Sequence, residues 1–245
     1  MRPCLLLTRP EPAARAFGEA MREAGWRGEV LIAPLMRIEM LPLEARVLEG
    51  VATVIATSMH GVRALAQATA RRDMRLWTVG PGTAAAARAE GFRDIHVAGG
   101  DAQALLRDMA RAGAEGPFLH LRGEHVAVDI GAALRAAGHA ARAEIAYRQA
   151  ALPLDPAAKA RIMAGGDLVC PIFSPRSGRL LVAAISGLDL QHTRLHMVAI
   201  SQNAAAPFAA LPCASRGIAP QPDNPGMMQE IMALQPKLEP WEKPS

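Results

Sequence analysis

Residues 51–66 read V-A-T-V-I-A-T-S-M-H-G-V-R-A-L-A, and this stretch decides the fold. Its first part is a continuous apolar run rich in β-branched residues, which is typical of a strand buried on both faces. Thr57 and Ser58 then interrupt the run, and apolar residues return at helical spacing from Val62. The stretch therefore predicts a strand, a turn that carries hydroxyl groups, and a helix.

The same unit recurs at four other places in the chain, which begin at Cys4, Leu76, Val169 and Val198. Each is a short apolar strand, then a Thr, Ser or Gly, then a helix start, without a strict sequence repeat. This is the pattern of an open α/β sheet, where a helix N-terminus beside the end of a parallel strand can bind an anion. The pattern predicts architecture rather than chemistry.

Length and composition limit the class of protein. The chain has 245 residues and is 51% hydrophobic, which is enough for one large or two modest domains. No apolar run approaches the roughly 20 residues that span a membrane, and the first residues lack the pattern of a signal peptide. We expect a soluble, cytoplasmic protein with no membrane partner.

The charge pattern allows three interpretations. The formal net charge is +4, and arginine supplies nearly all of the positive charge. Nucleic-acid binding is disfavoured because aromatic residues, which stack on bases, make up only 4% of the chain. Arginines such as Arg15, Arg107 and Arg111 lie along predicted helices, which favours solvated helix faces. A basic cleft for a small polyanion is the functional alternative.

Three cysteines, Cys4, Cys170 and Cys213, are widely spaced and fall in or beside predicted strands. This spacing does not match a metal site, and it favours buried core thiols.

The predicted elements form two α/β lobes, of which one is discontinuous. Strands are predicted at 4–8, 29–33, 53–57, 76–79, 95–98, 118–121, 140–143, 168–173, 196–200 and 214–218. Helices are predicted at 12–24, 61–70, 82–90, 102–112, 126–137, 156–164, 178–184, 204–210 and 225–234. The expected parts are residues 1–34 with 151–235 as the first lobe, 42–143 as the second lobe, 35–41 and 144–150 as linker strands, and 236–245 as a disordered tail.

The two linker segments, 35–41 and 144–150, alternate apolar and polar residues and can pair antiparallel. Ligands of open α/β sheets bind outside the carboxyl ends of the strands, and domain interfaces favour pockets. We therefore expect a site in a cleft between the lobes, lined by the hydroxyl-bearing turns.

Several short stretches of the sequence, taken together in their order and spacing, resemble those of a known protein family. The stretches are T-R-P at Thr8, P-L-M-R-I at Pro34, T-S-x-x-G-V at Thr57, V-G-x-x-T-A at Val79, G-F at Gly91, L-R-G at Leu121, the segment around Tyr147, F-S-P-R-S at Phe173 and A-I-S at Ala199. Together they resemble the uroporphyrinogen-III synthase family over nearly the whole chain. The resemblance agrees with two lobes linked by a two-stranded ladder. The expected fold class is α/β, with two flavodoxin-like parallel-sheet lobes joined by a two-stranded antiparallel linker, one lobe being discontinuous.

The resemblance also implies a reaction. Family members are cytoplasmic lyases of tetrapyrrole, porphyrin and heme biosynthesis that use no cofactor. They close a linear hydroxymethylbilane to uroporphyrinogen III, with inversion of the last ring and loss of water. The expected partner is this small linear tetrapyrrole, and we expect a monomer with no bound metal or nucleic acid.

The substrate's own pyrrole nitrogen expels the hydroxyl and leaves a reactive azafulvene. The protein must therefore fold the substrate so that the correct ring carbon attacks. Proximity and orientation of this kind can supply roughly 7–11 kcal/mol.

Tyr147 is the one tyrosine in the chain and lies in the second linker segment. The family suggests that its phenol protonates or positions the departing hydroxyl. The structural alternative is an amphipathic residue that packs at a hinge.

The other candidate residues would bind the carboxylates of the substrate. Side-chain hydroxyls or backbone N–H groups are offered by Thr57, Ser58, Thr83, Ser174 and Ser201. The alternative role for each of these is simple helix capping. Charged and amide side chains are offered by Arg9, Arg122, Arg176, His60 and Asn203. For the arginines the alternative is a place on the cleft rim.

The family often has a Gly and a Thr after the strand that ends here at Ile200. This chain has Ser201-Gln202-Asn203 instead, so Ser201 or Asn203 would replace the usual hydroxyl.

Two other functional classes fit the pattern less well. A non-catalytic two-lobed binding protein for a small polyanion would have the same architecture, but such proteins are usually exported. A nucleotide-sugar or methyl transfer enzyme needs a glycine-rich fingerprint, and V-G-P-G-T at Val79 is only a fragment of one.

Overall fold

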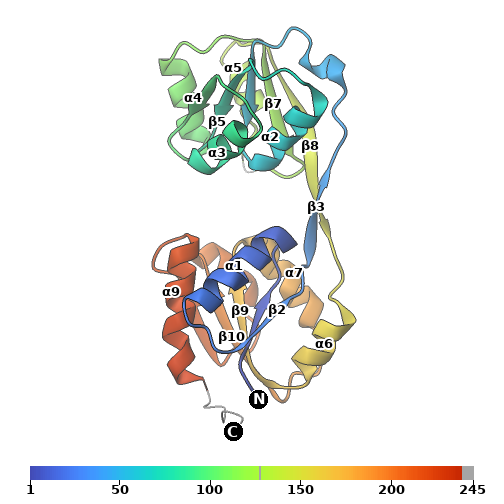
Figure 1. Ribbon diagram of the computed structural model, residues 1–245, viewed down its shortest axis with the longest axis vertical. Helices are drawn as coiled ribbons and strands as arrows, with labels where there is room; N and C mark the ends of the chain where they lie inside the picture. The colour runs from blue at the N-terminus through green and yellow to red at the C-terminus, as the bar shows by residue number, and fades with distance from the viewer. Residues whose placement is uncertain (127, 239–245) are drawn as a thin grey trace. The chain divides into compact units, whose positions relative to one another are not determined.

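The computed structural model describes residues 1–126 and 128–238 (Figure 1). It divides into two compact units, Met1–Arg37 with the chain from Ala150 onward, and Ile38–Gln149. Each unit holds one sheet with helices on both faces. The expected α/β class with two mainly parallel sheets is confirmed.

The sheet of the first unit has five strands in the order β11-β10-β9-β1-β2, all parallel. The strands are β1 (Cys4–Leu7), β2 (Glu29–Ile32), β9 (Gly166–Ile172), β10 (Thr193–Ala199) and β11 (Ser215–Ile218). Numbered along the chain, the order is 2-1-3-4-5. The strand order reverses between β1 and β9, which makes this the switch point of the sheet.

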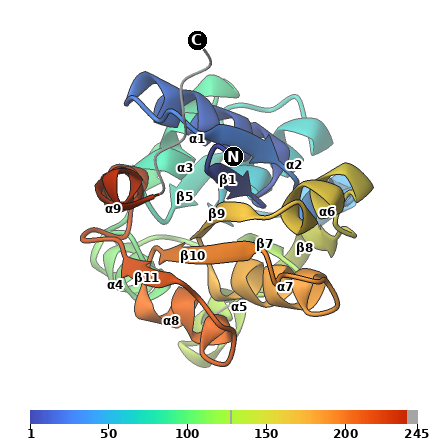
Figure 2. The same cartoon turned by 90° about the horizontal axis from the view of Figure 1, so that it is seen from below.

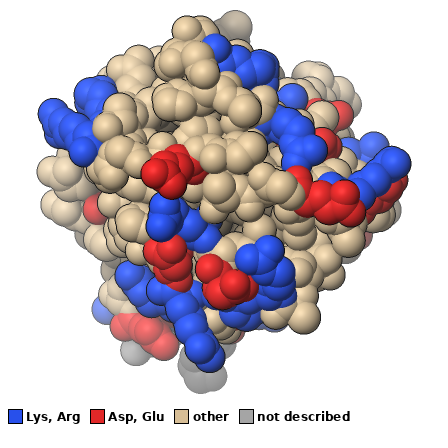
Figure 3. All heavy atoms as spheres, turned by 90° about the horizontal axis from the view of Figure 1, so that it is seen from above, with Lys and Arg blue, Asp and Glu red and all other residues tan. Residues whose placement is uncertain are grey.

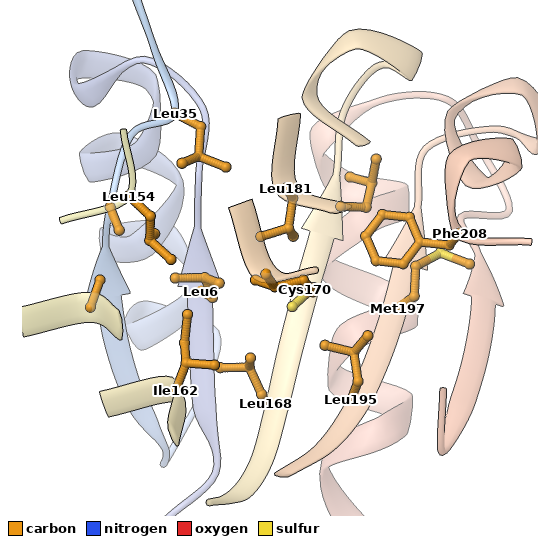
Figure 4. Close-up of a cluster of buried hydrophobic side chains, with 14 of the residues drawn as sticks. Leu6, Leu35, Leu154, Ile162, Leu168, Cys170, Leu181, Leu195, Met197 and Phe208 are labelled. Carbon is orange, nitrogen blue, oxygen red and sulfur yellow. The ribbon is translucent and has the colours of Figure 1, made fainter. Parts of the chain in front are cut away.

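Helices cover both faces of this sheet (Figure 2). They are α1 (Glu11–Glu23), α6 (Pro156–Met163), α7 (Pro175–Ile185), α8 (Gln202–Ala205) and α9 (Asn224–Leu234). On one face α1 and α9 pack against the sheet through Phe17, Met21 and Met227. On the other face the core includes Ile162 and Leu181, which point at the sheet residues drawn in Figure 4.

The sheet of the second unit has the order β3-β8-β7-β4-β5-β6. The strands are β3 (Met36–Met40), β4 (Thr53–Ala56), β5 (Arg75–Thr78), β6 (Ile95–Val97), β7 (Phe118–Gly123) and β8 (Ala141–Ala151). Without β3, and numbered along the chain, the order is 3-2-1-4-5. The lobe was expected to be flavodoxin-like, and this order differs from the order 2-1-3-4-5 of flavodoxin, because a strand–helix alternation fits more than one strand order. The switch point lies between β4 and β7.

The helices of the second unit are α2 (Met59–Ala68), α3 (Pro81–Ala89), α4 (Ala102–Arg111) and α5 (Ile130–Ala136), with the 3₁₀ helix η1 at Ala45–Leu48. One core lies under α2 and α3 and includes Val62 and Leu65. The other lies under α4 and α5 and includes Leu105 and Leu134.

Strand β8 is longer than expected. A short strand at 140–143 and a separate linker strand at 144–150 were expected, but the structure has one continuous strand. Its backbone bonds with the β3 segment join Leu41 N to Ala146 O, and Leu152 N to Leu35 O. The partner number falls as the residue number rises, so these two segments run antiparallel.

Three helices differ from the expected ones by three residues or more at one end, and a local signal explains the first two differences. The helix expected at 126–137 begins at Ile130, because Asp129 caps it by accepting from Ala132 N at 2.9 Å. Helix α7 begins at Pro175 rather than 178, directly after Ser174. The helix expected at 204–210 is a short α-helix followed by the 3₁₀ helix η2 (Ala206–Phe208).

The segment expected to be a disordered tail begins with structure. Gln235–Lys237 form the 3₁₀ helix η3, and Leu238 is 5% exposed in the core beside α1 and α9. The rest of the expected tail, 239–245, lies outside the described residues.

The observed burial agrees with two expectations about side chains, one for the cysteines and one for the arginines. Cys4 and Cys170 are fully buried and Cys213 is partly buried, as expected for core thiols, and burial raises the pKa of Cys4 to about 12. Arg15 and Arg111 are exposed and pair with acidic neighbours on their own helices. On the face seen in Figure 3, basic and acidic side chains adjoin one another. These pairs support solvated helix faces for the arginines.

Over the described ranges, none of the helices has the length and apolar character required to span a membrane.

Candidate functional site

The carboxyl edge of the second sheet gathers several candidate residues. Thr57 directly follows β4, and Ser58 is the N-cap of α2, where its side chain accepts from His60 N at 3.2 Å. Arg122 lies near the end of the neighbouring strand β7. The candidates after β4 and β7 therefore lie at the switch point of this sheet, where ligands of such folds bind.

Helix α2 approaches β7 closely at this edge because residue 61 is glycine. A Cβ atom at Gly61 would lie 2.9 Å from the carbonyl oxygen of Leu121. The T-S-x-x-G-V stretch thus has a packing reason for its glycine, and the turn at Ser58 is held near the end of β7.

Tyr147 joins this edge from β8. The Ser58 and Tyr147 hydroxyls form a hydrogen bond of 2.9 Å, across 89 residues of sequence. The His60 ring lies beside the phenol, with 5.2 Å between ring centroids and 54° between planes. Ser58, His60 and Tyr147 therefore form one cluster.

A β-bulge and a glycine set the position of the phenol. In the parallel ladder of β7 and β8, Arg122 pairs with Ile145, and Gly123 pairs with Tyr147, so the register skips Ala146. Bulges of this kind re-aim side chains. A Cβ at Gly123 would lie 2.9 Å from Cε2 and Cζ of the Tyr147 ring, so the ring rests on the glycine backbone.

Two ionisable side chains at this edge, Arg122 and His60, differ in their surroundings. The Arg122 guanidinium donates to the carbonyl oxygens of Gly123 at 3.0 Å and Glu124 at 3.1 Å. Burial, together with the charge of Arg63, lowers the pKa of His60, which keeps this imidazole neutral at pH 7.

Thr83 lies apart from the cluster. It is the third residue of α3, which follows β5 on the other side of β4. Thr83 is half-buried, and the helix begins with the backbone of Gly80 as N-cap.

Arg9 occupies the corresponding place in the first sheet, just after β1 at its switch point. Its guanidinium lies over the Phe173 ring at 4.2 Å from the centroid, and Nη1 donates to Asn224 Oδ1 at 3.3 Å. Phe173 is itself held edge-on by Phe17, with 5.0 Å between centroids. Burial lowers the pKa of Arg9, which still leaves it charged.

The serines of the first sheet cap helices. Ser174 forms a capping box with Ser177, since the Ser174 side chain accepts from Ser177 N at 3.1 Å and Ser177 Oγ accepts from Ser174 N at 3.0 Å. Ser201 accepts from Ala204 N at 3.3 Å at the start of α8. Ser174 and Ser201 therefore have the helix-capping role, which was the alternative to substrate binding. Their contacts with the substrate stay predictions.

Arg176 and Asn203 lie in the first turns of α7 and α8, at the same edge of the sheet. The interlobe cleft and the boundaries of the lobes also stay predictions.

Sequence reasoning missed three residues that shape these edges, Gly123, Phe173 and Asn224. Gly123 and Phe173 belong to the short stretches that carry the family resemblance, but no role was predicted for either residue. No sequence pattern pointed to Asn224. Within residues 1–126 and 128–238, no group of three or more His, Cys, Asp or Glu side chains could hold a metal ion.

A family model described as Uroporphyrinogen-III synthase HemD matches residues 15–229. The chain belongs to the uroporphyrinogen-III synthase family. Membership makes it an enzyme of this type, a lyase of tetrapyrrole and heme biosynthesis. A comparison with curated protein sequences finds no match.

Solved structures of uroporphyrinogen-III synthases share the fold. The enzyme from Helicobacter pylori 26695 has a TM-score of 0.67 and 14% identity, with 96% of this chain and 100% of that chain covered. A mutant enzyme from the extremely thermophilic bacterium Thermus thermophilus has a TM-score of 0.53 and 17% identity, with 96% and 99% covered. At these identities the likeness concerns the fold alone.

Proposed function

We propose that this chain converts linear hydroxymethylbilane to uroporphyrinogen III, with inversion of the last pyrrole ring and loss of water, and that Tyr147 supplies the proton to the departing hydroxyl. The observation that carries the role of Tyr147 is its position. The one tyrosine of the chain lies at the switch point of the second sheet, with its oxygen bonded to Ser58.

Departure of the hydroxyl needs this proton and an electron pair from the substrate. The lone pair of the substrate's own pyrrole nitrogen breaks the bond to the hydroxyl, which accepts a proton and leaves as water. The resulting azafulvene is then attacked by a ring carbon of the same molecule. A general acid at the leaving oxygen contributes typically about 10²–10⁴-fold.

The remaining candidates bind the carboxylates that the pyrroles carry. At the second sheet these are Thr57, Thr83, Arg122 and His60 with their neighbouring backbone N–H groups. At the first sheet they are Arg9, Ser174, Arg176, Ser201 and Asn203. Where a serine hydroxyl already caps a helix, the N–H groups of the first helical turn supply the contact, each worth about 0.3–1 kcal/mol.

Arg9 is the candidate of the first sheet with the most restricted geometry. Phe173 and Asn224 hold its guanidinium on two sides, so little side-chain entropy remains to be lost when it pairs with a carboxylate. Cytoplasmic location and a monomeric state are further parts of this proposal, and the family membership supports them.

The test uses hydroxymethylbilane generated in situ and separates the oxidised products by isomer. We expect the wild-type chain to give the type III isomer and the Tyr147→Phe variant to lower turnover at least tenfold, because the phenol proton is lost while the ring remains. Wild-type protein that yields only the type I isomer would defeat the enzyme proposal.

The fold of the variant is checked by its urea unfolding midpoint. A Tyr147→Phe variant with near-normal turnover would remove Tyr147 from catalysis and leave the family assignment intact. It would favour the alternative in which the phenol only packs against its neighbours.

A further inference from the structure

We infer that Ser58 is a positioning residue that holds the phenol oxygen of Tyr147 in place for proton transfer to the substrate, an inference that rests on the proposed role of Tyr147. From the sequence, Ser58 was expected to contact substrate or to cap a helix. The structure shows the cap and adds a contact that local sequence does not predict.

The hydrogen bonds of Ser58 hold the phenol oxygen beside the start of α2. A serine hydroxyl has one proton and two lone pairs. Ser58 Oγ accepts from His60 N–H at 3.2 Å and forms a hydrogen bond of 2.9 Å with the Tyr147 hydroxyl. Because the serine oxygen is itself tied to the backbone of α2, this second bond fixes the distance of the Tyr147 oxygen from the helix N-terminus.

The rest of the phenol has little freedom. Its ring rests on the backbone of Gly123, where a Cβ would come within 2.9 Å of two ring carbons. The His60 ring lies beside it at 5.2 Å between centroids. The hydrogen bond with Ser58 adds a third contact, which holds the phenol oxygen.

The two roles of the Ser58 hydroxyl have to be separated in any test. Glycine is accepted at an N-cap with only a small loss of helix stability, and threonine keeps both the cap and the donor. Ser58→Gly therefore removes the bond to Tyr147 with a small effect on α2. Asp155, which caps α6 by accepting from Ala157 N at 2.8 Å, provides the control Asp155→Gly for loss of a cap elsewhere.

The decisive experiment is a double-mutant cycle in the hydroxymethylbilane assay. We expect Ser58→Gly to lower kcat about tenfold, the upper range for one neutral hydrogen bond, with KM changed less than about twofold. Ser58→Thr should recover most of this loss. In the Tyr147→Phe background, Ser58→Gly should change kcat less than about twofold, because the hydroxyl that Ser58 positions is already gone.

Equal losses in both backgrounds would overturn the inference, since Ser58 would then act on the substrate directly. An unchanged kcat in the wild-type background would overturn it as well. Wild-type protein that forms no type III isomer is a different result, because it removes the proposed function itself.

A second readout is independent of turnover. Because the chain has one tyrosine, incorporation of fluorotyrosine gives a single ¹⁹F resonance from residue 147. We expect Ser58→Gly to shift this resonance, and Asp155→Gly to leave it in place. A resonance that does not respond to Ser58→Gly contradicts the hydrogen bond on which the inference depends.

Discussion

His120 is a buried titratable side chain that the proposed mechanism does not use. It lies on β7 with 1% exposure, and neither ring nitrogen has a hydrogen-bond partner among the residues that the structure describes. Burial, together with the positive charge of Arg122, lowers its pKa to about 4. An unpaired buried imidazole favours the neutral form, because charge without solvation is costly.

This gives a prediction for stability against pH. The unfolded chain binds a proton at His120 near pH 6.5 and the folded chain near pH 4, so the unfolded state holds more protons between these values. The stabilisation is fully present above pH 6.5 and is lost as pH falls to 4, by about 3 kcal/mol at most. Urea unfolding of His120→Leu across this range should show a shallower loss than the wild type.

The control for this measurement is His125→Gln, which changes an exposed histidine. It should follow the wild-type profile. If the profiles of His120→Leu and wild type coincide, His120 does not titrate with folding.

At the scale of elements, Arg72 joins the ends of two helices. Its Nε donates to Glu90 O at 2.6 Å, just after α3, and its Nη1 to Thr69 O at 2.6 Å, just after α2. Its Nη2 also donates to Ala66 O at 3.2 Å. Carbonyls at a helix C-terminus lack intrahelical partners and carry partial negative charge. The Arg72 guanidinium supplies these carbonyls with hydrogen-bond donors and with a compensating positive charge.

We expect Arg72→Met to lower the free energy of unfolding by about 2–3 kcal/mol, since several charge-assisted hydrogen bonds disappear while the aliphatic stem remains. The neighbouring Arg71→Met is the matched control. Arg71 is exposed and pairs with Asp73, so its loss should change little. Equal urea midpoints for the two variants would contradict the capping role of Arg72.

At the scale of the whole molecule, the second unit is one continuous piece of chain, whereas the first is built from two. The Ile38–Gln149 unit has its own sheet and a core on each face of it. We therefore expect a fragment of these residues to unfold cooperatively in urea, with Trp77 as its fluorescent reporter.

By the same reasoning, a fragment of residues 1–37 should remain unfolded. Its strand β1 lacks the β9 partner that buries its other side. A fragment of the second unit without a cooperative transition would show that its stability depends on the first.

The sequence by itself determined the fold class, most of the strands, and the turns in which the candidate residues lie. Buried parallel strands such as Cys4–Leu7 and Thr53–Ala56 are continuous apolar runs, and caps such as Ser58 are local signals. Such features depend on neighbours in the chain and can therefore be read from it. The start of α5 was missed although Asp129 is a local cap, because the apolar residues just before it also fit a helix.

Only the tertiary structure decided the strand order of the second sheet and the partners at its edge. The bond between Ser58 and Tyr147 joins residues 89 positions apart, and it needs Gly61 to admit α2 and a bulge in β8 to turn the phenol. No local pattern encodes such a contact, because it arises from the register and packing of elements that are distant in the chain.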